Sequence, residues 1–149
     1  MKKTYLYRLF GLGSVPKNLL SLLHNEGIVV SDEGMSGWFI AKHVNGPRKR
    51  YRHRTEGFSG CLVVTQERVI SYTYGKRQIN ISVSDPKIAN LYVDILNEDK
   101  LCLSFESSDF REGWDGLIEF RFNTNRAHQF REALIEIGVQ QGTAPDART

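Results

Sequence analysis

The strongest chemical signal in this sequence is a cluster of basic residues around the Asn45-Gly46-Pro47 turn. Residues 42–54 contain no acid and six basic side chains, namely Lys42, Arg48, Lys49, Arg50, Arg52 and Arg54. If the run after the turn is extended, the alternate arginines from Arg48 to Arg54 share one face, about 6.6–6.8 Å apart. Such a row is costly to bury without partners, and guanidinium donors match phosphate oxygens. The run therefore predicts a surface that binds anionic lipid or another phosphate-bearing ligand.

Two other interpretations of the basic run stay open at this stage. The run can be a solvated hairpin that only keeps the protein soluble, or a non-specific nucleic-acid surface, since basic runs of this length also serve there. The rest of the chain disfavours nucleic acid. The whole chain has a net charge of +3, and residues 42–54 alone carry +6, so the remaining residues have a net charge of −3.

A second charged segment has the opposite sign. Residues 94–119 contain eight acids and only two basic residues, and the loop at 109–116 places Phe110 and Trp114 among those acids. Aromatic side chains are enriched at the energetic centres of protein interfaces, so this loop is a candidate partner-binding patch. The alternative is that both rings fold back onto the rim of the sheet.

No arrangement of residues indicates an enzyme. The four histidines do not occur in a metal-ligand spacing such as H-x-x-x-H, and the acids of the 109–116 loop do not match a calcium-binding loop. Cys61 and Cys102 lie in strand-like runs without a basic partner that would activate a thiol. We therefore expect no catalytic residue, no metal site and no cofactor.

Length and composition describe one ordinary domain. The chain has 149 residues, of which 40% are hydrophobic and 25% charged. No segment approaches the ~18 consecutive apolar residues that cross a bilayer, and no cleavage site follows the N-terminal lysines. We expect a cytoplasmic protein with reduced thiols. If the basic hairpin binds lipid, the protein would also associate with the membrane periphery.

The elements that must position these residues are mostly strands. Ser14 and Pro16 are typical of a helix start, and Gly27 is a natural end for that helix. Period-two alternation then predicts short strands, at 27–30, 37–44, 58–65, 68–74, 77–83, 91–95, 101–105 and 118–122. An apolar stripe predicts a final helix over 125–137, capped by Asn125: Ala127, Phe130, Leu134 and Ile137.

One hairpin carries a family resemblance. The run Gly60-Cys61-Leu62-Val63-Val64-Thr65-Gln66-Glu67-Arg68-Val69-Ile70 resembles the G-x-L-x-x-T-x-x-R-h-h hairpin of GRAM domains and bacterial PH-like domains. The resemblance covers about residues 27–137. It implies a mainly β (α+β) fold, an antiparallel barrel of about seven strands capped by a C-terminal helix. Many PH domains bind phosphoinositides near the first hairpin with a K-x(n)-K/R-x-R pattern, and Lys42, Arg48 and Arg50 are similar in order and spacing.

These observations predict three segments, an N-terminal helical extension (1–26), a PH-like barrel (27–137) and a flexible tail (138–149). The predicted function is non-enzymatic recruitment to an anionic membrane surface or phosphate-bearing ligand through the basic hairpin. The main alternative is a protein- or peptide-binding scaffold that uses the barrel edge or the 109–116 loop, with a homo-oligomer as one form of it. A third is a small barrel enzyme or ligand carrier.

Overall fold

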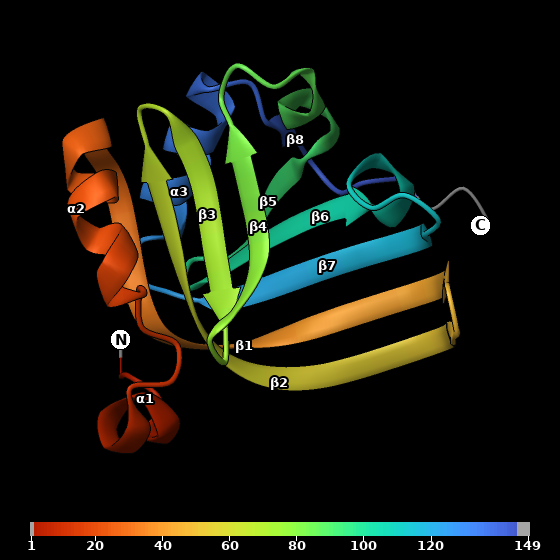
Figure 1. Ribbon diagram of the computed structural model, residues 1–149, viewed down its shortest axis with the longest axis horizontal. Helices are drawn as coiled ribbons and strands as arrows, with labels where there is room; N and C mark the ends of the chain where they lie inside the picture. The colour runs from red at the N-terminus through yellow and green to blue at the C-terminus, as the bar shows by residue number, and fades with distance from the viewer. Residues whose placement is uncertain (1, 146–149) are drawn as a thin grey trace.

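The computed structural model describes residues 2–145 and shows one curled sheet with helices at its ends (Figure 1). The helices are α1 (Tyr5–Phe10), α2 (Lys17–Glu26) and α3 (Ala127–Glu136), with short 3-10 turns η1 (Pro86–Asn90) and η2 (Ser107–Asp109). The strands are β1 (Ile28–Gly46), β2 (Lys49–Thr65), β3 (Arg68–Thr73), β4 (Lys76–Ser82), β5 (Tyr92–Asn97), β6 (Lys100–Glu106), β7 (Asp115–Asn123) and β8 (Gln140–Gln141). Their order in the sheet is β4-β3-β2-β1-β7-β6-β5-β8.

The two longest strands hold the sheet together. β1 pairs with β2 along most of its length and with β7 over its second half, so it joins the β1–β4 meander to the β5–β7 meander. The sequence predicts two short strands at 27–30 and 37–44, but these are one strand. Irregularities in its pairing between Asp32 and Met35 interrupt the alternation on which the prediction depends. In Figure 1, β3 and β4 stand across the long strands, which gives the sheet its curl.

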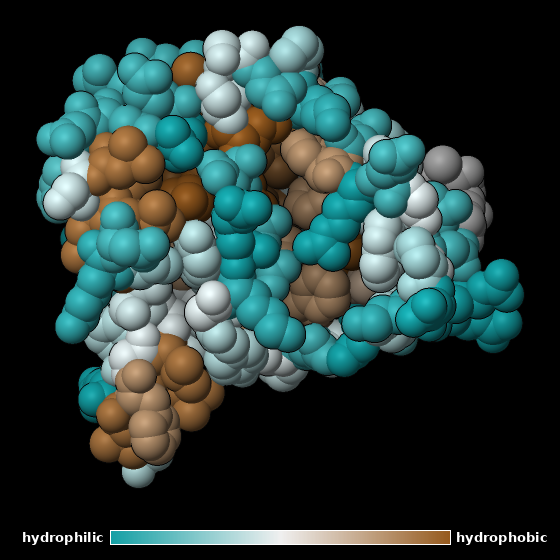
Figure 2. Space-filling model, in the orientation of Figure 1, coloured by the Kyte–Doolittle hydropathy of each residue, from teal (hydrophilic) through white to brown (hydrophobic). Residues whose placement is uncertain are grey.

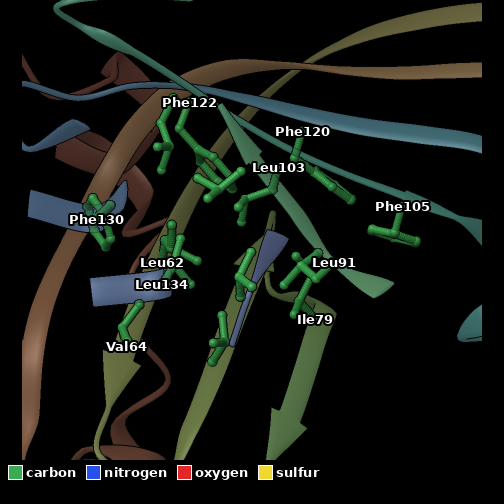
Figure 3. Close-up of a cluster of buried hydrophobic side chains, with 14 of the residues drawn as sticks. Leu62, Val64, Ile79, Leu91, Leu103, Phe105, Phe120, Phe122, Phe130 and Leu134 are labelled. Carbon is green, nitrogen blue, oxygen red and sulfur yellow. The ribbon is translucent and has the colours of Figure 1, made fainter. Parts of the chain in front are cut away.

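The last helix fills one end of the curled sheet, as its apolar stripe predicts. Ala127, Phe130 and Leu134 are fully buried in the main core, and Ile137 packs half-buried against it. Figure 3 shows Phe130 and Leu134 beside Leu62 and Val64. The predicted cap is wrong by one residue, since the helix begins after Arg126 and receives no side-chain cap.

The N-terminal region holds two helices where the sequence predicts one. α2 packs its Leu23 against the outer face of β2 and β3, and it ends at Gly27, whose φ of 81° suits glycine. Ser14 does not cap this helix, because its hydroxyl donates to the Gly11 carbonyl instead. The additional helix, α1, has no buried residue.

The described part of the chain contains eight strands in one open curled sheet with β4 and β8 at its edges, whereas the resemblance implies a barrel of about seven strands. The additional strand, β8, lies in the segment predicted to be a flexible tail and pairs in parallel with β5. Beyond it, the Gly142 amide donates to the Val93 carbonyl at 2.8 Å, and the amide of buried Ala144 donates to Oγ of Ser104 at 2.9 Å. Residues 146–149 of the predicted tail lie outside the described residues.

Deletion of residues 142–149 is expected to destabilise the protein, although the composition of this segment alone predicts no effect. The deletion removes the two hydrogen bonds of Gly142 and Ala144, each with a net value of roughly 0.5–1.5 kcal/mol. A loss of about 1–3 kcal/mol in the free energy of unfolding should therefore appear in urea titrations. An unchanged midpoint would show that the segment behaves as the flexible tail that its composition predicts.

Candidate functional site

The basic residues lie on the hairpin formed by β1 and β2. Gly46 pairs with Lys49, so Pro47 and Arg48 form a two-residue turn. Proline suits the first turn position, and Arg48 takes the left-handed φ of 68° that a type II turn requires at the second. Figure 1 shows this tip at the end of the long strands, on the side of the molecule away from α2.

Four basic side chains of this hairpin are exposed and lack partners. Arg48, Lys49, Arg50 and Arg52 make no ion pair with any residue that the structure describes. The other two predicted binding residues are paired: Nζ of Lys42 lies 3.9 Å from Oε1 of Glu119, and Arg54 forms an ion pair with Glu56. The cations without ion-pair partners are therefore gathered at the tip. The acidic 109–116 loop lies beside it, since Asn45 Nδ2 donates to Oδ1 of Asp115 at 2.9 Å and Gly113 lies next to Pro47.

The predicted row of four arginines is interrupted at both ends, because Arg48 lies in the turn before β2 and Arg54 lies on the other face of the strand. His43 has a φ of 53°, so Ala41 and Val44 face the same side of β1 although they are three residues apart. Their cross-strand partners, Arg54 and Tyr51, follow them to that side. Arg54 therefore shares the concave face with Lys49 and Tyr51 rather than the face of Arg50 and Arg52, because the left-handed residue breaks the alternation.

Replacement of Arg48 with glycine should weaken binding to anionic surfaces without lowering the free energy of unfolding. A left-handed backbone costs an L-residue roughly 1–2 kcal/mol, whereas glycine adopts it freely but is more flexible when unfolded. We expect Arg48→Gly to leave the free energy of unfolding unchanged or raise it by up to about 1 kcal/mol. Binding to an anionic surface should nevertheless fall about fivefold, the value of one charge. A variant that loses stability in urea titration would contradict this description of the turn.

The two aromatic residues of the 109–116 loop fold back onto the sheet. The Phe110 ring packs edge-on against Phe105, with ring centroids 4.8 Å apart. Trp114 covers Gly46, where an added Cβ would come within 2.3 Å of the indole. The alternative that the sequence left open, rings folded onto the rim, therefore describes this loop, and only the remaining exposed edges of the rings could contact a partner.

The two cysteines are unsuited to nucleophilic chemistry. Both thiols are free and buried in the sheet. Burial raises the pKa of Cys61 to about 11 and that of Cys102 to about 12, so both thiols are protonated at neutral pH.

A cavity next to the hairpin brings together basic residues that the sequence did not connect. It measures about 500 Å³, and Lys76, Arg77 and Arg111 line it together with Lys49 and Arg54. Figure 2 shows a hollow in this face with an apolar floor and a hydrophilic rim. The sequence shows the adjacent basic pair Lys76-Arg77 after the Tyr74-Gly75 turn. Only the fold shows that this pair lines the same cavity as Lys49 and Arg54 of β2.

No protein-family model and no curated protein matches this chain. Within residues 2–145, none of the helices combines the length and apolarity needed to span a bilayer.

Proposed function

We propose that this chain is a non-enzymatic PH-like module that is recruited to anionic membrane surfaces through the tip of its β1–β2 hairpin. The observation that carries the proposal is the exposure of Arg48, Lys49, Arg50 and Arg52 without ion-pair partners among the described residues. The arrangement of two antiparallel meanders around α3 supports the PH-like part, since it agrees with the resemblance in the 60–70 hairpin.

The expected strength of this attraction follows from the number of charges. Each lysine or arginine near an anionic leaflet contributes about 1 kcal/mol, so four give about 4 kcal/mol. The attraction fades over a Debye length of about 8 Å at physiological salt, which means that only residues at the tip contribute fully. Lys42 lies back along the strand beside buried Glu119 and adds little.

The scaffold alternative has less support from the structure. A peptide could add to the sheet only at an edge strand, and β4 is one such edge. This strand begins with exposed Lys76 and Arg77, and charged residues on edge strands oppose pairing with another chain. The 109–116 loop offers only the partly covered rings of Phe110 and Trp114.

Co-sedimentation with vesicles tests the proposal. The full chain is mixed with phosphatidylcholine vesicles that contain increasing fractions of phosphatidylserine, at low and at high salt. Binding should rise with the anionic fraction and fall with salt, because it depends on screened charges. Absence of binding at low salt, or equal binding to neutral vesicles, would reject the proposal.

A further inference from the structure

The cavity beside the hairpin lies at the end of the curled sheet that α3 does not fill. Residues of β1, β2, β4, β6 and β7 line it, and α3 contributes none of its walls. Figure 3 places Phe105, which lines this cavity, at the opposite side of the core cluster from Phe130 of α3. Its volume of about 500 Å³ falls within the roughly 300–1,000 Å³ of small-molecule sites.

The inner wall of the cavity is aromatic and apolar. Ile79, Phe105 and Phe120 are buried there, at 6%, 8% and 2% exposure. Phe39 packs against Phe120 with ring centroids 5.3 Å apart, and Phe110 and Trp114 close the wall beside η2. The rings support one another, so they form a preformed apolar lining rather than loose side chains.

The rim has the opposite character. Five basic residues and one acid, Glu56, line the cavity. Arg54 is neutralised by its ion pair with Glu56, and the Arg111 guanidinium lies 5.9 Å from the centre of the Trp114 ring. Lys49, Lys76 and Arg77 have no ion-pair partner within the described part of the chain.

We infer that this cavity binds an amphipathic organic anion, with the apolar body against the aromatic wall and the carboxylate or phosphate at Lys49, Lys76 and Arg77. A fully polar anion would leave the aromatic wall without a contact, and an apolar molecule would leave the basic rim without one. Charge and surface complementarity together select a ligand that has both parts. This site shares Lys49 with the membrane surface proposed above but is otherwise separate from it, because Arg48, Arg50 and Arg52 do not line the cavity.

Tryptophan fluorescence can report binding directly. The chain has two tryptophans, of which Trp114 lines the cavity and Trp38 is half-exposed outside it. In the full chain carrying Trp38→Phe, octanoate should change the Trp114 emission saturably. Acetate, which has the charge without the apolar body, and octanol, which has the body without the charge, should each bind about tenfold more weakly or worse. Octyl phosphate in place of octanoate distinguishes a phosphate from a carboxylate preference.

Substitutions on the rim complete the test. Lys76→Gln with Arg77→Gln changes two exposed side chains and should weaken octanoate binding about tenfold without affecting octanol. Lys87→Gln with Lys100→Gln, in η1 and at the start of β6 outside the cavity, removes the same charge and should have no effect. Glutamines at Arg48, Arg50 and Arg52 should also leave octanoate binding intact, which separates this inference from the membrane proposal. No saturable signal, equal affinity for octanol, or no effect of the rim variant would overturn it.

Discussion

The combined replacement of Arg48, Arg50 and Arg52 with glutamine is expected to weaken binding to anionic vesicles on the order of a hundredfold. Each of these exposed charges contributes about 1 kcal/mol at the membrane, and together they account for about 3 kcal/mol. The fold should be unaffected, since none of the three makes an ion pair with a described residue. Vesicle titration at low salt measures the partition coefficient, and urea titration checks the fold.

A matched triple variant controls for net charge. Lys17, Lys87 and Lys100 are exposed on α2, on η1 and at the start of β6. Their replacement with glutamine removes the same charge but should change vesicle binding far less. Equal losses in the two variants would show that overall charge, not the hairpin, attracts the protein. If Trp114→Ala were the damaging change while the hairpin variant still captured its target, the 109–116 loop would be the contact surface.

Truncation of a buried side chain on the helix that fills one end of the curled sheet should have the largest effect on stability. Leu134 is completely buried against the inner face of the sheet, and Leu134→Ala is expected to cost about 2–5 kcal/mol in the free energy of unfolding. Ile135, the next residue of α3, is 39% exposed, and Ile135→Ala should cost less than about 1 kcal/mol. Chemical denaturation of both variants measures the difference. A loss for Leu134→Ala no larger than that of the control would mean that α3 does not close the core.

The sequence predicted the elements whose signals are local. The stripe of Ala127, Phe130 and Leu134 repeats at helical spacing, and it correctly identified both the helix and its buried face. The alternation of Ile79 and Ile81 likewise identified β4. The hairpin turn was predicted at Asn45-Gly46-Pro47, close to its observed place at Pro47 and Arg48, because Pro47 favours such a turn.

The features that the sequence did not predict depend on contacts between distant residues. α1 has only six residues and is held by bonds across the chain: Thr4 to Ser59, and Tyr7 to Glu33. Helix propensity does not predict a helix this short, because so few residues do not form a stable helix on their own. The tail segment docks because Ser104 and the edge of β5 offer hydrogen-bond partners, which its own composition does not show.

The candidate site was predicted only in part for the same reason. The composition of the run revealed the exposed cations of the hairpin, but the alternation rule placed Arg54 on the wrong face because it cannot detect the left-handed His43. The cavity unites Phe39, Ile79 and Phe105 from three strands with Trp114 from a loop. Only the curl of the sheet brings these residues together.

An NMR titration of the isotope-labelled protein with anionic lipid nanodiscs locates the surface that contacts the membrane. The backbone amides of residues 46 and 48–52 should lose intensity first, because the proposed membrane-binding surface is the hairpin tip. Neutral nanodiscs should leave these signals unchanged. An equal loss with neutral nanodiscs, or a loss centred on α1 or residues 109–116 while 46–52 stay unaffected, would show that the hairpin tip is not the membrane-binding surface.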